Sequence, residues 1–435
     1  MSGRTLLPQR RRFLGGGVPP VPPPESILLG VGSVSNSLIA YPRAAPIVAA
    51  DWYVNAETGS DAYTGKAIGF AFATFEKALS VASAGQTIIA YGTFQRTSAL
   101  VVNKAVTIAG YGANRWVIDR GLGGTTSGVA HAGIRVTASG ATIRGFGVKG
   151  VPTRSDADYA TYAVEVTSGT EDVTVENGVI WGGKSGSIML YQAVRPRVLD
   201  VVTIGSSGAG AASNMPDGIV ATANSGQATI DPVIVRCLAA NVGDDCFDLF
   251  RATGAKVIDC VAIAAGISHT GATLGDGNGF KTGGTSSGNN ELRGSISVHA
   301  RTTGITNNAN AGAANLFLNN TAAHNARGLL SDDGTPPQQT NNIALNNTLY
   351  DTSVAGPQTL NSWNLSITDA DFAAIASGDW SLVPASACIG AGSGGANLGA
   401  SDVALALLKT WWNHSLIYVP GRGNGSGGTG LPGDL

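Results

Sequence analysis

Two neighbouring segments decide the fold: VIVRCLAANV (Val233–Val242) is followed by KVIDCVAIAAG (Lys256–Gly266). Both are short apolar runs that contain a cysteine, and the two cysteines lie 23 residues apart. Similar phrases recur from about residue 87, among them AVTIAGYG, VTVENGVIW, ELRGSISVHA, NLFLNNTAAHN and NIALNNTLYD. Aligning them places in one column Asn177, Asp200, Cys237, Cys260, Ser295, Asn320 and Asn347. The steps indicate a repeat of about 24 residues, twice lengthened by insertions.

A repeat of this length that carries strands but no helical period predicts a single right-handed parallel β-helix, an all-β fold. Each coil of such a solenoid stacks on the last at about 4.8 Å, and its inward residues form ladders. We expect roughly 10–12 coils, with the two LNNT segments (Leu318–Thr321 and Leu345–Thr348) stacked as asparagine ladders and both cysteines free. An antiparallel sandwich fits worse, because it turns every 8–12 residues or so and keeps no such register.

The composition agrees with this fold and excludes several classes of protein. The chain has 435 residues, of which 61 are glycine and 13% are charged, and its net charge is −2. Many glycines suit short strands joined by tight turns and argue against a helical bundle. The low net charge predicts no nucleic-acid partner. No apolar run reaches the roughly 18 residues that a membrane span requires.

We divide the chain into three parts. Residues 1–50 form a Pro-rich arm, in which RRRFLGGG (Arg10–Gly17) resembles a twin-arginine export signal. VPPVPPPES (Val18–Ser26) follows where an export signal needs an apolar run, so we expect an anchoring arm, with export as the alternative. Residues 51–400 form the β-helix, capped by an amphipathic helix around residues 72–82. Residues 401–435 form a C-terminal tail with an exposed tryptophan pair, Trp411–Trp412.

A second column of the repeat carries charged residues. In register are DGIV (Asp217–Val220), DCFD (Asp245–Asp248), NGFK (Asn278–Lys281), TGIT (Thr303–Thr306) and RGLL (Arg327–Leu330). The third position is always apolar and therefore points inward, so the fourth must point outward. Asp248 and Lys281 thus share an outward position on adjacent coils. Asp217 lies one coil before Asp245, and Asp244 precedes Asp245.

Four carboxylates and one lysine therefore converge on one outer face. Mutual repulsion makes such a cluster unfavourable unless a positive partner lies among the carboxylates. Anionic oxygen ligands are typical of a hard cation, and Ca²⁺ tolerates their irregular geometry better than Mg²⁺ does. We predict that calcium is bound by Asp217, Asp244, Asp245 and Asp248.

Three motifs, PDGIV, GDDCFDLF and GDGNGFKTGG, resemble those of pectate lyases of polysaccharide lyase family nine. The resemblance covers roughly residues 51–400. It implies calcium held by the four aspartates and Lys281 as the catalytic base. It also implies cleavage of an acidic, uronate-containing polysaccharide by β-elimination, with calcium neutralising the uronate carboxylate.

Two other functions remain open from the sequence. One is a non-catalytic carbohydrate-binding or structural virion protein. The other is a glycoside hydrolase with an acid and a base carboxylate, in which Lys281 would have no role. A Pro-rich arm before a β-helix lyase resembles bacteriophage tailspikes and fibres, which are usually trimers. We therefore expect a homotrimer on the virion tail or fibre, docked through residues 1–50, with a secreted bacterial pectate lyase as the alternative.

Overall fold

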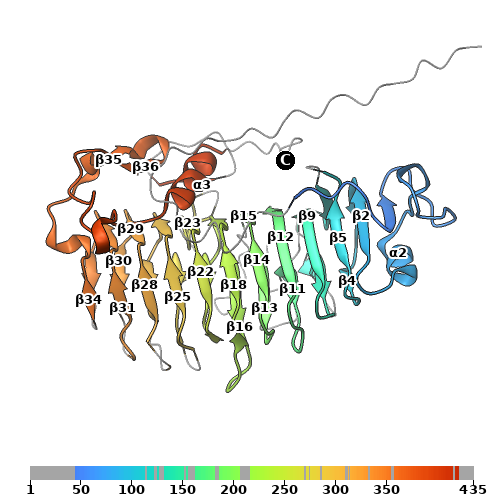
Figure 1. Cartoon of the computed structure of the whole chain (residues 1–435), viewed down its shortest axis with the longest axis horizontal. Helices are drawn as coiled ribbons and strands as arrows, with labels where there is room; N and C mark the ends of the chain where they lie inside the picture. Colours follow the sequence, from blue (N-terminus) through green and yellow to red (C-terminus); the bar gives the residue numbers. More distant parts are fainter. Residues whose placement is uncertain are drawn as a thin grey trace, which may run out of the picture. The chain divides into compact units, whose positions relative to one another are not determined.

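The computed structural model describes residues 45–112, 115–121, 125–126, 132–150, 153–154, 162–181, 186–205, 216–268, 271–273, 275–284, 287–308, 312, 314–331, 334–353, 357–414 and 417–420. Within these residues the named strands pair in parallel, coil on coil, apart from one antiparallel pair near the C-terminus (Figure 1). The predicted parallel β-helix is confirmed. The Pro-rich arm lies outside the described residues as far as residue 44.

Three ladders of strands form the coils. The first ladder contains β1 (Trp52–Asn55), β2 (Thr87–Tyr91), β5 (Thr107–Gly110), β9 (Thr142–Lys149), β12 (Thr174–Trp181), β14 (Arg197–Leu199), β18 (Val233–Val235), β22 (Lys256–Ile258), β25 (Glu291–Arg293), β28 (Leu316–Leu318), β31 (Gln338–Thr340) and β34 (Gln358–Thr359). The second ladder belongs to the same 20-stranded sheet and shares β9 and β12 with the first. Its other strands are β3 (Thr93–Gln95), β6 (Trp116–Asp119), β15 (Val202–Ile204), β19 (Leu238–Ala240), β23 (Val261–Ile263), β26 (Ile296–Val298), β29 (Thr321–Ala323) and β32 (Ile343–Leu345).

The third ladder is a separate 10-stranded sheet, which agrees with the expected number of coils. It contains β4 (Leu100–Val102), β8 (Ile134–Val136), β11 (Tyr162–Val166), β13 (Gly186–Tyr191), β16 (Ile219–Thr222), β20 (Phe247–Asp248), β24 (Phe280–Lys281), β27 (Thr303–Thr306), β30 (Arg327–Leu330) and β33 (Tyr350–Ser353). Short pairs complete the set: β7 (Thr125–Thr126) with β10 (Thr153–Arg154), β17 (Thr229–Ile230) with β21 (Ala252–Thr253), and β35 (Phe372–Ala374) with β36 (Asp379–Leu382). The 3-10 helices are η1 (Ile68–Phe70), η2 (Ser362–Asn364), η3 (Asp369–Asp371), η4 (Ile375–Ser377) and η5 (Ser393–Gly395).

A repeated left-handed residue makes the corner between the first two ladders. Its φ lies between 50° and 57° in Asn177, Asp200, Arg236, Asp259, Asn319 and Asn341. Asn and Asp tolerate this conformation better than most residues, which accounts for their recurrence in the phrases. The strand register places Asn177 and Asp200 in this corner column, one position before Cys237. The prediction that Asn177 and Asp200 share a column with Cys237 and Cys260 is therefore wrong. Sequence spacing alone does not distinguish a polar residue at the corner from a polar residue that points inward.

Asparagine ladders are present, but their partners differ from the prediction. Backbone N–H groups donate to the side-chain Oδ1 one coil later in Ser295–Asn320 (3.0 Å), Asn320–Asn342 (2.9 Å) and Asn325–Asn347 (2.9 Å). Asn347 therefore belongs to a second ladder, and the two LNNT segments do not stack on each other. The segment before Thr348 holds two Asn-Asn pairs five residues apart, and only the tertiary register shows which pair faces which.

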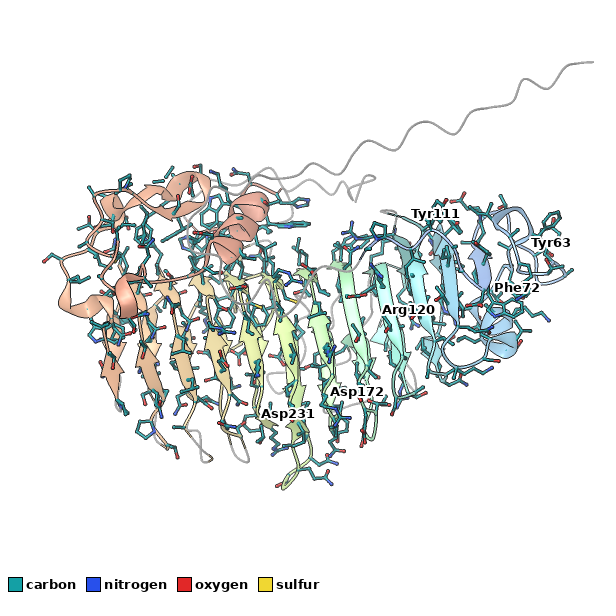
Figure 2. All side chains as sticks on the ribbon, in the orientation of Figure 1. Tyr63, Phe72, Tyr111, Arg120, Asp172 and Asp231 are labelled. Carbon is teal, nitrogen blue, oxygen red and sulfur yellow. The ribbon has the colours of Figure 1, made fainter. Side chains whose placement is uncertain are left out.

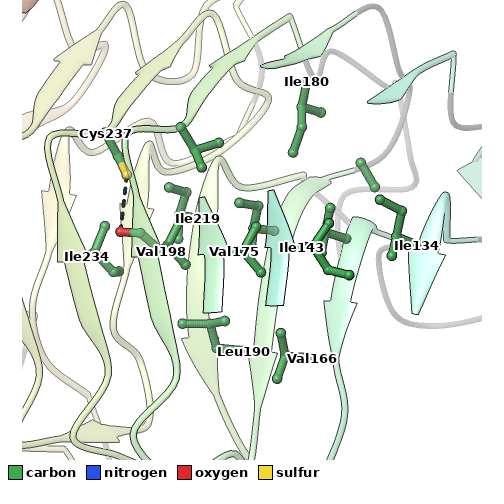
Figure 3. Close-up of a cluster of buried hydrophobic side chains, with 14 of the residues drawn as sticks. Ile134, Ile143, Val166, Val175, Ile180, Leu190, Val198, Ile219, Ile234 and Cys237 are labelled. Atoms are coloured by element: carbon green, nitrogen blue, oxygen red, sulfur yellow. Dashed lines mark hydrogen bonds between the residues drawn. The ribbon is translucent and has the colours of Figure 1, made fainter. Parts of the chain in front are cut away.

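The interior of the coils is filled by stacked aliphatic side chains. Ile143, Val175, Val198 and Ile234 stand in one ladder and are fully buried (Figure 3). Burying each such side chain contributes about 1.5–3 kcal/mol. Cys237 continues the packing as a free thiol that donates to Val198 O at 3.5 Å, as predicted.

Helix α2 (Phe75–Val81) covers the N-terminal end of the stack, and helix α3 (Asp402–Trp412) packs against its side (Figure 1). Helix α2 begins after Thr74, whose hydroxyl accepts from Lys77 N, and it buries Phe75 and Leu79. Phe72 precedes this helix and pairs with Val54 in a strand bridge, so the helix is shorter than predicted (Figure 2). Helix α3 lies within the expected tail and contacts β23.

The prediction of an exposed tryptophan pair is wrong, because Trp411 is partly buried and Trp412 is fully packed. Trp412 is only 2% exposed, within an apolar cluster that includes Val298, Trp380 and Leu408. The outward faces of the second ladder are apolar, so the helix gains burial by packing there. No helix among the described residues is long and apolar enough to cross a membrane.

Candidate metal and active site

Three successive strands of the 10-stranded sheet bring the predicted site residues together. Ile219 pairs with Phe247 and Phe247 with Phe280, while Val220 pairs with Asp248 and Asp248 with Lys281. The predicted register is confirmed. The Phe247 and Phe280 rings stack inside the coil at 4.8 Å with an interplanar angle of 12°. This inward contact holds the backbone from which Asp248 and Lys281 project outward.

Three of the four predicted calcium ligands form a compact group. Asp217, Asp244 and Asp245 each offer a carboxylate oxygen, and these atoms lie within 4.8 Å of one another. Asp245 is fully buried, Asp217 is nearly so and Asp244 is half-buried. Asp248 is not part of this group, and its Oδ2 lies instead 3.4 Å from Lys281 Nζ. A buried aspartate triad of this kind could hold a metal ion.

The following coil orients two of these carboxylates. Asp245 Oδ1 accepts from the backbone N (2.7 Å) and the Nδ2 (2.8 Å) of Asn278. Asp244 Oδ1 accepts from the backbone N of Asp276 (2.5 Å) and of Gly277 (3.4 Å). One oxygen of each carboxylate is therefore held by protein, and the other remains available for a cation.

Two buried carboxylate oxygens of this cluster have no hydrogen-bond donor, and they show whether these residues are suited to bind a metal ion. They are Asp245 Oδ2 and Asp248 Oδ1. Unpaired buried charge is costly unless a cation compensates for it. The Lys281 ammonium lies 3.0 Å from Asp245 Oδ2, outside hydrogen-bonding geometry, and supplies only part of that charge. The donor set, all carboxylate oxygen, fits a hard cation such as calcium.

Lys281 is largely buried among these acids. Its side chain is 13% exposed, and its Nζ lies 5.6 Å from the centre of the Phe250 ring. Burial alone would lower the pKa of Lys281, but the carboxylates of Asp248, Asp245 and Asp217 raise it above its ordinary value. The ammonium form is therefore favoured without a bound cation.

The same surroundings also raise the pKa values of three of the aspartates. Burial, and then the carboxylate of Asp245, raises the pKa of Asp244 to about 7. Burial raises the pKa of Asp248 to about 6, although the Lys281 ammonium opposes this shift. Burial and the neighbouring carboxylates also raise the pKa of Asp217 well above its ordinary value. The metal-free cluster thus carries more negative charge than its surroundings stabilise.

Two further residues, missed by sequence reasoning, lie at the site: Tyr162 contacts the triad itself, and Asn241 stands three residues before Asp244. The Tyr162 hydroxyl donates to Asp217 Oδ2 at 3.0 Å from a strand 55 residues earlier. The Asn241 side chain donates to Tyr418 O (3.0 Å) and accepts from Tyr418 N (2.8 Å), so the C-terminal segment braces the loop that carries Asp244. No local sequence motif predicts the Tyr162–Asp217 or the Asn241–Tyr418 contact, because each joins segments that are distant in the chain.

This fold and this cluster define a class of protein: a parallel β-helix whose outer face carries a buried aspartate triad beside one lysine. A family model described as "Pel9A-like, right handed beta helix region" matches residues 52–342. The chain belongs to this Pel9A-like family.

Solved structures agree with the family. The structure is similar to that of pectate lyase Pel9A, with a TM-score of 0.69 and 22% identity over 80% of this chain and 95% of that one. It is also similar to a rhamnogalacturonan lyase, with a TM-score of 0.58 and 20% identity over 74% of this chain and 90% of that one. At these identities the likeness establishes the fold alone. A comparison with curated proteins gave no match.

Proposed function

We propose that this chain is a calcium-dependent lyase that cleaves an acidic, uronate-containing polysaccharide by β-elimination. The observation that carries the proposal is the position of Lys281 Nζ, 3.0 Å from Asp245 Oδ2 and beside the aspartate triad. A lone amine among ligand carboxylates suits proton abstraction next to a bound cation. The likeness to a pectate lyase and a rhamnogalacturonan lyase supports the same class of reaction.

In this mechanism Asp217, Asp244 and Asp245 would hold the calcium ion, with Asp248 as the fourth carboxylate. When bound, calcium supplies positive charge that neutralises the uronate carboxylate and offsets the aspartates that keep Lys281 protonated. Neutral Lys281 then takes the C5 proton on Nζ. The electron pair left at C5 forms the C4=C5 double bond, the C4–O bond breaks, and the glycosidic oxygen leaves with the electron pair of that bond.

An activity screen tests the proposal. The full chain is incubated with a panel of acidic polysaccharides in calcium and in chelator, and the formation of ultraviolet-absorbing unsaturated ends is followed. We expect product with at least one polysaccharide in calcium and none in chelator. Binding without unsaturated product across the panel would contradict the lyase and favour a non-catalytic carbohydrate-binding protein.

Calcium should stabilise the fold, and more so at higher pH. The folded-state pKa values of Asp244 (about 7) and Asp248 (about 6) exceed the usual value near 4. Without metal, the stability that these groups contribute is complete below about pH 4 and is lost as the pH rises through their folded values. We expect the rise in Tm on adding calcium to be larger at pH 8 than at pH 5, because a cation binds the ionised carboxylates. Equal shifts at both pH values, or no shift at all, would count against a metal at these residues.

We further propose that the protein acts as a depolymerase on a phage tail or fibre, as a homotrimer docked through residues 1–50. The run VPPVPPPES, where an export signal needs an apolar segment, supports an anchoring arm. Deleting residues 1–50 should leave a cooperatively melting β-helix, residues 51–400, that no longer joins its particle. Unimpaired assembly of the shortened chain would contradict this setting and favour a secreted lyase.

A further inference from the structure

Tyr162 reaches the aspartate triad from two coils away. It begins β11, its side chain is buried, and its hydroxyl donates to Asp217 Oδ2 at 3.0 Å. Strand β13 lies between β11 and β16, so the ring must cross a whole coil to make this bond.

Gly186 provides the space for this crossing. It is the partner of Tyr162 in β13, and a Cβ added there would lie 2.2 Å from Cε1 and 2.5 Å from Cδ1 of the Tyr162 ring. Its φ is not in the left-handed region, so the backbone conformation does not require glycine. What requires glycine is the tyrosine ring that lies over it.

The bond from Tyr162 completes the restraint on Asp217. The other oxygen of this carboxylate, Oδ1, accepts from the backbone N of Asp245 at 3.2 Å. Each oxygen of Asp217 therefore has one donor and keeps further lone-pair capacity. The two donors come from opposite sides along the stack, one from β11 and one from the turn before β20, so rotation of the carboxylate would break a buried hydrogen bond.

We propose that Tyr162, in the space left by Gly186, is a positioning residue for the calcium site. It holds Asp217 so that its remaining lone pairs face Asp244 and Asp245. The inference rests on the calcium of the proposed function, and it adds a residue that no ligand motif contains. Donors to a ligating carboxylate orient it, and their loss typically lowers metal affinity by about 10- to 100-fold.

The decisive variant is Tyr162→Phe, which keeps the ring and removes only the hydroxyl. We expect the calcium Kd of the full chain, measured by calorimetry, to rise about 10-fold or more. The matched control is Tyr191→Phe in β13, whose hydroxyl donates to Asn224 Oδ1 at 2.6 Å away from the triad. This control removes the same chemical group, a tyrosine hydroxyl with one acceptor, and should leave the calcium Kd unchanged.

Two more measurements separate positioning from simple packing. In Tyr162→Phe, the calcium concentration for half-maximal lyase activity should rise by the same factor as the Kd, while the activity at saturating calcium stays near that of the wild type. Gly186→Ala should displace the ring and weaken calcium binding in the wild type. In the Tyr162→Phe background it should cost little further affinity, because the bond is already lost.

The outcomes are distinct. An unchanged calcium Kd in Tyr162→Phe, or an equal loss in Tyr191→Phe, overturns the role of Tyr162. If the wild type binds calcium but yields no unsaturated product, the lyase proposal fails, and the Kd comparison still decides the role of Tyr162. If the wild type binds no calcium, the positioning role is overturned together with the metal site.

Discussion

Lys281→Ala is expected to form no measurable unsaturated product on a polysaccharide that the wild type cleaves. Loss of a general base lowers turnover by about 10²- to 10⁴-fold. The calcium Kd of the variant should stay at or below that of the wild type, because the ammonium 3.0 Å from Asp245 Oδ2 competes with the cation. Product formation is followed by ultraviolet absorbance and calcium binding by calorimetry.

The controls for this prediction concern charge and position. Lys281→Arg should also be inactive, because a guanidinium stays protonated and cannot accept the proton. Lys256→Ala, in the first ladder and exposed, should keep wild-type turnover. The activity of the wild type should rise toward alkaline pH as the base loses its proton. Wild-type turnover by Lys281→Ala would rule out the proposed mechanism.

Asp245→Asn is expected to weaken calcium binding more than the same change at any other aspartate of the cluster. Asp245 is fully buried at the centre of the site, with Oδ1 held by Asn278 and Oδ2 facing Lys281. The substitution removes a charge and can set an amide N–H against the ammonium. Loss of a residue that merely orients a ligand lowers metal affinity by about 10- to 100-fold, so loss of a ligand charge should lower the calcium affinity by about 100-fold or more.

The matched control for Asp245→Asn is Asp276→Asn. Asp276 is exposed and helps the site through its backbone N–H, which the substitution keeps. The calcium Kd of Asp276→Asn should change only a little, because the substitution removes just one nearby surface charge. Equal losses in both variants would mean that net charge alone governs binding, and a tight calcium site in Asp245→Asn would exclude Asp245 as a ligand.

The fold could be predicted because the coils of a β-helix appear in the sequence as a repeat of similar residues at regular spacing. Each coil repeats the same inward positions, so the apolar ladder through Ile219, Phe247 and Phe280 is visible as spacing. The same spacing misplaced Asn177 and Asn347. Polar residues stand both at the left-handed corner and in the inward asparagine ladders, and residue type does not tell these two positions apart.

The sequence by itself determined the parallel coils and the adjacency of Asp248 and Lys281, because a side chain that repeats once per coil must face its counterpart one rung away. Only the tertiary structure decided which carboxylate oxygens lie within reach of one another. It groups Asp217 with Asp244 and Asp245 and turns Asp248 toward the lysine. It also brings Tyr162 to Asp217 and Tyr418 to Asn241. The physical reason is that these contacts depend on how distant segments pack together. That packing sets the path of a turn and allows an aromatic ring to extend across a neighbouring coil, and the spacing of residues within one segment does not reveal it.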